Sequence, residues 1–241
     1  IDVGANGCYS FEVFDTCRPI PDSEAGNADL SLLSYLDCCD QSFVEYQKRV
    51  PAADYRNTFQ YLCYHTPFGG MVKGAHRNMM RKHTAIQRDQ IEQDFLQRAQ
   101  PGLTYCQRVG NIMGATVLLS LASAIDHGQF ESAGRIGCFS YGSGCSSEFY
   151  SGVVLPSGQQ KLSSMQLGKQ LDSRYRLSMP EYKCLLEASN AVKFGTRNVK
   201  LDFAQLPQAW DAISSHVPGS GRARPLLSEI IEFYRHYEWI A

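Results

Sequence analysis

The chain has 241 residues, of which 44% are hydrophobic, so it is long enough to bury a substantial core as one large domain or two small ones. Its net charge of −1 argues against a general nucleic-acid-binding protein, because affinity for phosphates requires an excess of lysine and arginine. The longest apolar run, Ile112 to Ile125, is shorter than the roughly 20 residues that span a bilayer, so it predicts a buried helix and no membrane association.

The chain opens with Ile1 to Gly7, which has no initiator methionine and no signal-peptide pattern and resembles the end of a strand entering a glycine-rich turn. We therefore expect the chain to be part of a longer polypeptide. Residues 16–28, rich in proline, aspartate, serine and glycine, predict a loop. From Leu30 to Val50, apolar and aromatic residues recur at three- and four-residue steps and predict a helix that Pro51 ends.

The middle of the chain alternates between strand and helix patterns. Phe59 to Tyr64 predicts a strand, and Gly70 to Lys82 predicts a helix. A polar, exposed helix is expected over residues 84–98. Asn111 to His127 is apolar nearly all round and predicts a helix central to the core, which Gly128 ends.

The remaining patterns complete an alternation of strands and helices. A Gly-Ser-Gly turn separates two segments of strand composition, Arg135–Tyr141 and Glu148–Leu155, and predicts an antiparallel pair. This alternation predicts an α/β layered domain. The C-terminal expectations are a helix at Met179–Asn190 with Pro180 in its first turn, a short strand at Val199–Phe203, an exposed loop at 219–225 and a closing helix at Leu226–Trp239.

The nine cysteines do not form a disulfide or metal-binding pattern. No C-x-x-C occurs, Cys38 and Cys39 are adjacent, and most of the others lie in apolar surroundings, where free cysteine behaves as a small hydrophobe. The odd number favours reduced thiols and therefore a cytoplasmic protein. His76 and His83 are seven residues apart but have no third ligand nearby, so we expect no metal site.

The segment from Tyr64 to Arg77 carries the main functional signal. An apolar run ends at His65, then Pro67 and two glycines follow and a helix begins, which places the imidazole at a strand tip beside the positive end of a helix dipole. A neutral imidazole there can donate its N–H to a carbonyl that is gaining negative charge. By itself, a histidine at a strand end is more often a hydrogen-bonded structural residue, so both interpretations stay open.

Two further residues have a structural and a functional interpretation. Asn111, at the start of the apolar helix, is either its N-cap or an amide aimed at a substrate carbonyl beside His65. Ser143, between Gly142 and Gly144, is either a hairpin turn residue or part of a backbone that approaches a ligand closely enough to form an oxyanion hole.

The helix expected after His65 has a basic stripe on one face. Lys73, Arg77 and Arg81 recur every four residues, opposite an apolar face. The stripe is either the solvated side of the helix or a surface that attracts an anionic group towards His65.

Together these motifs resemble the C-terminal half of the 3-hydroxy-3-methylglutaryl-CoA (HMG-CoA) synthase family. The residues that carry the resemblance are those around His65, the run Arg108-Val109-Gly110-Asn111 and the run Phe139-Ser140-Tyr141-Gly142-Ser143-Gly144. The likeness extends from Asp15-Thr16-Cys17-Arg18-Pro19 to Tyr150-Ser151 and is less distinct in the C-terminal part of the chain. The glycines after Phe68 make the chain more similar to the branch that acts on acyl carrier proteins in polyketide pathways than to the members that use CoA.

The resemblance implies a thiolase-like layered αβαβα fold, of which residues 1–241 supply mainly the C-terminal half. It implies an aldol-type condensation of an acetyl unit with an acetoacetyl thioester on an acyl carrier protein, which gives a 3-hydroxy-3-methylglutaryl-type thioester for polyketide β-branching. His65 is then the histidine that polarises the acceptor carbonyl. The acyl pocket is expected to involve Asn111, Ser143, Pro67, Tyr141 and Gly142. The resemblance also implies a homodimer and no tightly bound cofactor, with substrates carried on phosphopantetheine of a carrier protein or CoA. The stripe of Lys73, Arg77 and Arg81 would then guide a phosphopantetheine phosphate, or the acidic surface of a carrier protein, towards His65.

In this family the cysteine that takes the acetyl group and the glutamate that removes a methyl proton belong to the N-terminal half. None of the nine cysteines lies in a matching motif, so we expect activity only when the N-terminal half of the synthase is present. Two other functions remain open. One is a ketoacyl synthase of the initiating type, which forms a carbon–carbon bond with loss of CO2, and the other is a non-catalytic subunit that docks a carrier protein.

Overall fold

The computed structural model of the chain describes residues 1–20, 23–174, 176–202 and 224–240. The chain divides into two compact units, one formed by residues 1–17 and 25–172 and the other by residues 18–24 and 173–241. Within the described residues, no helix has both the length and the apolar character needed to cross a membrane.

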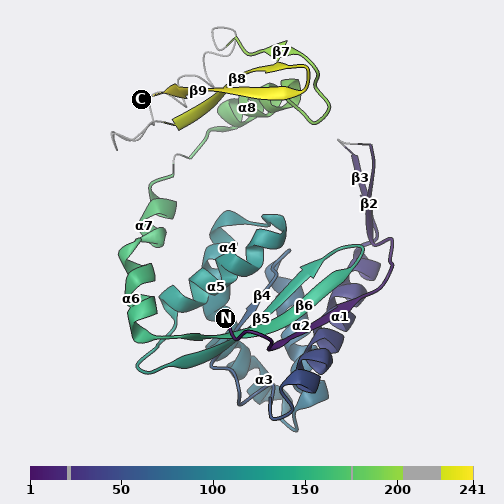
Figure 1. Ribbon diagram of the computed structural model, residues 1–241, viewed down its shortest axis with the longest axis vertical. Helices are drawn as coiled ribbons and strands as arrows, with labels where there is room; N and C mark the ends of the chain where they lie inside the picture. Colours follow the sequence, from purple (N-terminus) through teal and green to yellow (C-terminus); the bar gives the residue numbers. More distant parts are fainter. Residues whose placement is uncertain (21–22, 175, 203–223, 241) are drawn as a thin grey trace. The chain divides into compact units, whose positions relative to one another are not determined.

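A four-stranded sheet in the order β1-β6-β5-β4 is the centre of the first unit (Figure 1). Strand β6 pairs antiparallel with both β1 and β5, which confirms the antiparallel pair expected on either side of the Gly-Ser-Gly turn. Strand β4 pairs parallel with β5, and Cys63 lies opposite Cys138. The strands are β1 (Asn6–Ser10), β4 (Tyr61–Tyr64), β5 (Gly134–Gly142) and β6 (Ser146–Val154).

Side chains on the two faces of this sheet build two separate hydrophobic cores. On one face, Leu62, Phe139 and Phe149 pack with helices α1 and α2. On the other face, Tyr61 and Cys138 pack with α5. Because successive strand residues point to opposite faces, a nearly continuous apolar run such as β4 is what a sheet covered on both sides requires. The helices are α1 (Ala28–Arg49), α2 (Gly69–His83), α3 (Arg88–Asp94), α4 (Thr104–Val109), α5 (Thr116–His127), α6 (Pro156–Ser164) and α7 (Leu167–Asp172).

Three expectations for the part of the chain before residue 128 are changed by the structure. The expected loop at 16–28 contains two short paired strands, β2 (Thr16–Ile20) and β3 (Ser23–Gly26). The expected exposed helix at 84–98 is α3 followed by a π-helical segment, Phe95–Ala99, and it is only partly exposed, because Ile91, Phe95 and Arg98 are buried. The expected helix at 111–127 begins only at Thr116, after a 3-10 turn at Met113–Ala115.

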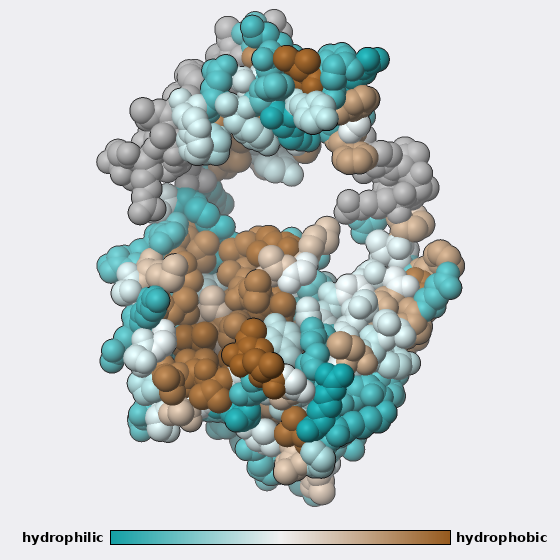
Figure 2. All heavy atoms as spheres, in the orientation of Figure 1, coloured by the Kyte–Doolittle hydropathy of each residue, from teal (hydrophilic) through white to brown (hydrophobic). Residues whose placement is uncertain are grey.

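Helix α5 is covered on only part of its surface. Val117 and Ala124 are buried against the sheet, but Leu118 is 60% exposed, so the helix is not buried all round as expected. Figure 2 shows hydrophobic side chains gathered on this side of the first unit. The exposed apolar residues near α5 include Ile112, Met113, Leu118, Val153 and Leu155. An apolar surface of this kind is typical of an interface.

The second unit contains helix α8 (Met179–Ala191) and a three-stranded antiparallel sheet. Helix α8 is confirmed, and Ser178 and Glu181 form a capping box at its start. The expected closing helix at 226–239 is wrong, because this segment is the hairpin of β8 and β9. The strands are β7 (Val199–Lys200), β8 (Arg224–Ile231) and β9 (Tyr234–Ile240). Most of the loop expected at 219–225 lies outside the described residues.

The hairpin was missed because its turn lacks the usual residues. Glu232 and Phe233 both have positive φ, +46° and +71°, which is the conformation of a two-residue turn that Asn-Gly normally occupies. Leu226 and Ile230 are four residues apart, so they also fit a helical repeat. The β-branched and aromatic residues of the segment favour the strands that form.

Candidate active site

His65 lies directly after β4, at the strand tip where the sequence placed it. Its backbone N–H donates to the carbonyl of Phe139 in β5 at 2.7 Å, so the parallel pairing continues through this residue. The hydroxyl of Tyr35 in α1 donates to the carbonyl of His65 at 2.6 Å. The residue is 7% exposed. Both backbone groups of His65 are therefore hydrogen-bonded to neighbouring elements, and only the side-chain torsions determine where the ring points.

The imidazole of His65 contacts the start of α5. Its Nδ1 is 2.8 Å from Oγ1 of Thr116, and the same hydroxyl is 2.5 Å from the carbonyl oxygen of Met113. Burial lowers the pKa of His65, while the backbone carbonyl of Met113 acts in the opposite direction. Because the net shift is downward from 6.5, the ring is mostly neutral at pH 7.

Asn111 lies in the exposed loop between α4 and α5 and is not the N-cap of α5. Its Oδ1 accepts a hydrogen bond from the backbone N–H of Met113 at 2.9 Å. Met113 has φ +56°, a left-handed conformation that is uncommon for a residue with a side chain. Asn111 is therefore connected to His65 through Met113 and Thr116.

Tyr141 links His65 to the turn that carries Ser143. The two ring centroids are 6.1 Å apart. Gly142 and Ser143 follow as exposed residues at the end of β5, and Gly144 has φ +120°. Among the described residues, no hydrogen bond joins Gly142 or Ser143 to the ring.

A buried carboxylate, Asp15, holds this turn. Its Oδ1 accepts from the backbone N–H of Gly144 at 3.0 Å, and its Oδ2 accepts from the hydroxyls of Ser31 at 3.0 Å and Tyr141 at 3.2 Å. Asp15 is 0% exposed. Burial, with the negative charge of Asp15, raises the pKa of Tyr141 and keeps its hydroxyl a donor.

Pro67 lies in a small pocket on the α4 side of the loop that follows His65. This pocket has a volume of about 200 Å³. Its other walls come from the same loop and from α4, and they include Phe68, Leu103, Cys106 and Gly110. Pro67 is thus two positions from His65 in the chain, and α4 forms one wall of the pocket that Pro67 lines.

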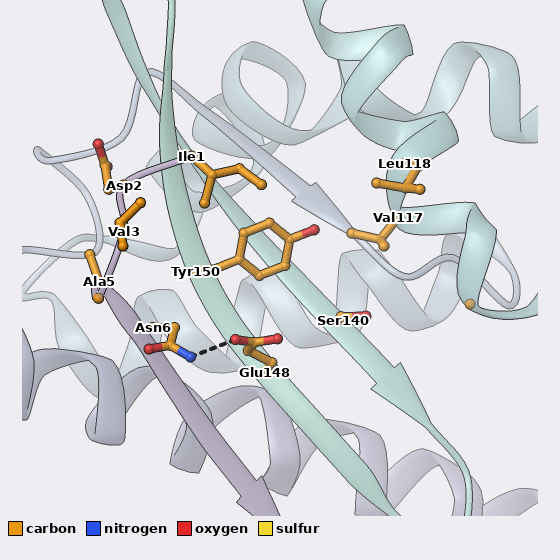
Figure 3. A pocket seen from close by; sticks show the side chains of 12 residues that line it. Ile1, Asp2, Val3, Ala5, Asn6, Val117, Leu118, Ser140, Glu148 and Tyr150 are labelled. Carbon is orange, nitrogen blue, oxygen red and sulfur yellow. Dashed lines mark hydrogen bonds between the residues drawn. The ribbon is translucent and has the colours of Figure 1, made fainter.

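A larger cavity, about 560 Å³ in volume, lies between the N-terminal segment and the start of α5. Figure 3 shows the ring of Tyr150 between Ile1 and Val117, and Asn6 donating to Glu148. That hydrogen bond joins Nδ2 of Asn6 to Oε1 of Glu148 at 2.7 Å. The lining is mainly apolar and does not include His65, although Gly114 and Ser140 come from segments next to the ring.

The basic stripe on α2 is partly neutralised. Nζ of Lys73 is 2.5 Å from a carboxylate oxygen of Glu92, so its charge is paired within the chain. Arg77 borders a surface hollow beside α3, and Arg81 is exposed. Among the described residues, Arg77 and Arg81 have no acidic partner within salt-bridge distance, so the unpaired charge of the stripe lies in the middle and C-terminal part of α2. Within the described residues, no three potential metal ligands gather at one place.

Comparison with known proteins decides the family. Residues 77–202 match the family model described as "Hydroxymethylglutaryl-coenzyme A synthase C terminal". Over all 241 residues, the chain is 61% identical to the polyketide biosynthesis 3-hydroxy-3-methylglutaryl-ACP synthase PksG of Bacillus subtilis (strain 168). The chain belongs to the HMG-CoA synthase family. It spans 56% of the length of PksG.

Solved structures agree with this assignment to the HMG-CoA synthase family. The crystal structure of the curacin biosynthetic pathway HMG synthase is 59% identical, with a TM-score of 0.91, and the match covers 100% of this chain and 58% of that one. In sequence, the chain is also 31% identical to the hydroxymethylglutaryl-CoA synthase of Enterococcus faecalis over 159 residues, which are 65% of this chain and 39% of that protein. The fold is therefore the C-terminal part of the thiolase-like fold of HMG synthases.

Sequence reasoning placed His65, Tyr141 and Asn111 in this candidate site but missed two residues that contact them or their neighbours, Asp15 and Thr116. Asp15 appeared only as part of a resembling motif, and Thr116 appeared only as one position of an apolar helix. The pattern around Thr116 gave no signal, because its contact with His65 depends on where α5 begins. A buried carboxylate such as Asp15 becomes visible only when the fold closes around it.

Proposed function

We propose that this chain is the C-terminal part of a synthase that condenses an acetyl unit with an acetoacetyl thioester on an acyl carrier protein. The product is a 3-hydroxy-3-methylglutaryl-type thioester for polyketide β-branching. The observation that carries the proposal is His65, a buried imidazole held by Thr116 at a strand tip beside Tyr141, in a chain that is 61% identical to an HMG-ACP synthase.

The chemistry of an aldol-type addition suits this environment. An enolate attacks a ketone, and the new alkoxide requires polar groups placed at the point where negative charge develops. His65, the amide of Asn111 and the turn at Ser143 supply such groups. Burial strengthens the electrostatic effect of His65, because a group shielded from water has a lower effective dielectric constant around it.

An N-terminal half supplies the other groups of this proposed reaction. By family likeness, these are the cysteine that carries the acetyl unit and the glutamate that takes a methyl proton. Support comes from the length of the chain, which is just over half that of PksG, and from the apolar side chains exposed beside α5. A second copy of the synthase completes a homodimer in this proposal.

The proposed substrate carrier is the phosphopantetheine arm of an acyl carrier protein, with no tightly bound cofactor. Solved structures of the curacin HMG synthase include complexes with apo, acetyl and holo donor-ACP. On this chain, Arg77 and Arg81 offer cationic groups on the helix that follows His65, where they attract an acidic carrier surface. All nine cysteines are free thiols, which supports a cytoplasmic enzyme.

The proposal is tested by joining this chain to an N-terminal half and supplying acetyl and acetoacetyl carrier proteins. Mass spectrometry of the acceptor carrier protein should show the methylglutaryl adduct, and the His65→Ala variant should lower its rate by about 100-fold or more. A linear ketoacyl product would support the initiating ketoacyl synthase instead. No acylation of any kind, together with carrier binding, would support the docking subunit.

The carrier surface is tested with a charge reversal and a matched control. Arg81→Glu should raise the KM for carrier-bound substrate by about 10-fold at low salt and less at high salt, because an attraction between opposite charges becomes a repulsion. Arg56 is equally exposed but lies on a turn after α1, so Arg56→Glu should leave this KM unchanged. Equal effects of the two variants would refute the proposed surface.

A further inference from the structure

The hydroxyl of Thr116 contacts two groups at once. Its Oγ1 is 2.5 Å from the carbonyl oxygen of Met113 and 2.8 Å from Nδ1 of His65. Thr116 is 0% exposed, so solvent does not compete for these contacts. A hydroxyl has a single proton to donate, and a backbone carbonyl only accepts. The proton between Thr116 and Met113 therefore belongs to Thr116.

This assignment decides the proton position on His65. With its proton given to Met113, Oγ1 of Thr116 presents only lone pairs to Nδ1. Two lone pairs at 2.8 Å repel each other, so Nδ1 must carry the hydrogen and donate it to Oγ1. Neutral imidazole has only one N–H, which leaves Nε2 without a proton. The lowered pKa of His65 supports the neutral form at pH 7.

The amide of Asn111 can also be assigned, and its donor group is the one left free of contact with Met113. The backbone N–H of Met113 is a donor, so the atom of Asn111 that faces it is the acceptor Oδ1. The remaining polar group of this exposed side chain is Nδ2, which only donates. The left-handed turn at Met113 thus orients both an acceptor for Thr116 and a donor for Asn111.

We propose that Thr116 is a positioning residue that holds neutral His65 with its proton on Nδ1, so that Nε2 carries no proton while the ring is neutral and Nδ2 of Asn111 is then the donor to the ketone oxygen. The roles towards the ketone rest on the proposed function, whereas the proton position is a property of the chain. The sequence suggested that a neutral His65 donates its N–H to the substrate. With the proton on Nδ1, that N–H is given to Thr116, and Nε2 donates only after the ring gains a second proton.

The proton position is tested by NMR on the chain labelled with 15N in histidine. In the wild type, the long-range 1H–15N pattern of His65 should show a protonated Nδ1 and an unprotonated Nε2, and its signals are identified by their loss in His65→Asn. Thr116→Ser keeps the hydroxyl and should keep this pattern. Thr116→Val has a similar shape without the hydroxyl and should shift the ring towards the tautomer with its proton on Nε2.

An unprotonated Nδ1 in the wild type would overturn the proposal, even if Thr116→Val does not fold. An unchanged pattern in a folded Thr116→Val variant would overturn it as well. In the synthase assembled with an N-terminal half, Thr116→Val should lower kcat by about 10-fold with little change in KM, and Thr116→Ser should restore kcat to within about 3-fold. If the assembled wild type makes no methylglutaryl product, the proposed function fails while the NMR result still decides the role of Thr116.

Discussion

Replacing Asp15 by alanine should loosen the turn that carries Ser143, because this carboxylate is the common acceptor for that turn. It receives three hydrogen bonds, from the backbone of Gly144 and from the hydroxyls of Ser31 and Tyr141. Alanine leaves all three donors without this acceptor, which is itself 0% exposed, although Gly144 lies at the surface and Ser31 is half-buried. The loss is therefore one of hydrogen bonds to a buried carboxylate.

The size of the effect follows from those bonds. A hydrogen bond to a charged group contributes about 1.5 kcal/mol at the low end of its usual range, so three of them amount to about 4.5 kcal/mol. Asparagine gives a matched comparison, because its Oδ1 still accepts from Gly144 and its Nδ2 donates to hydroxyls that rotate to accept. We expect Asp15→Asn to cost about 1.5 kcal/mol, mainly through the loss of charge.

The assay is urea unfolding of the wild type and both variants, with amide hydrogen exchange at Gly144 as a local readout. Asp15→Ala should lower the free energy of unfolding by about 4.5 kcal/mol and speed exchange at Gly144 more than Asp15→Asn does. If Asp15→Ala unfolds within 1 kcal/mol of the wild type, or if the two variants behave alike, the carboxylate does not hold the turn.

Three further changes test the packing around the site, each by the free energy of unfolding in urea. A Cβ at Gly7 would lie 2.1 Å from a backbone nitrogen of α1, so Gly7→Ala should lower the free energy of unfolding by about 3 kcal/mol. Gly74 in α2 has open space around it, so Gly74→Ala should raise the free energy of unfolding by about 0.5 kcal/mol. Similar values for the two variants would contradict the close approach of β1 to α1. Arg98→Met should lower the free energy of unfolding by about 3 kcal/mol or more, because the partly buried carboxylate of Asp94 loses the guanidinium that donates to it from two nitrogens. A decrease below 1 kcal/mol would refute this reasoning. Burial lowers the pKa of His76 below 6.5, although Asp94 acts in the opposite direction. Protonation therefore favours the unfolded chain, and the free energy of unfolding should fall as the pH drops from 6.5 through the folded pKa. His76→Gln should make this dependence on pH less steep, and an unchanged dependence would show that His76 does not contribute to it.

Most of the first unit was predictable because its patterns are local. The strand ending at Tyr64 and the helix after it follow from an apolar run, a proline and two glycines, and the hairpin of β5 and β6 follows from its glycine turn. The C-terminal hairpin was not predictable in the same way. Its turn uses Glu232 and Phe233 in a conformation that neither residue signals, and tertiary pairing overrides a pattern that also fits a helix.

In the candidate site, too, local features were predictable from the sequence and contacts between distant residues were not. The position of His65 is a local property of a strand end, so the sequence was sufficient to find it. Thr116, which contacts the ring, is 51 positions away along the chain, and Asp15 is 126 positions from Tyr141, from whose hydroxyl it accepts a hydrogen bond. Whether Asn111 caps a helix depends on where α5 starts, and the 3-10 turn at Met113 moves that start by several residues. Contacts of this kind come from packing, which a single sequence does not display.

The unequal covering of the central sheet has a consequence for how the site is assembled. The backbone of His65 is tied to the side that this chain closes by itself, through Tyr35 of α1, whereas its ring is held from α5, the side that remains open to another surface. A protein surface that covers α5 would therefore contact the helix that holds the imidazole and not the helix that holds the strand. The hydroxyl of Thr116, the first residue of α5, is the contact through which such a surface would act on the ring.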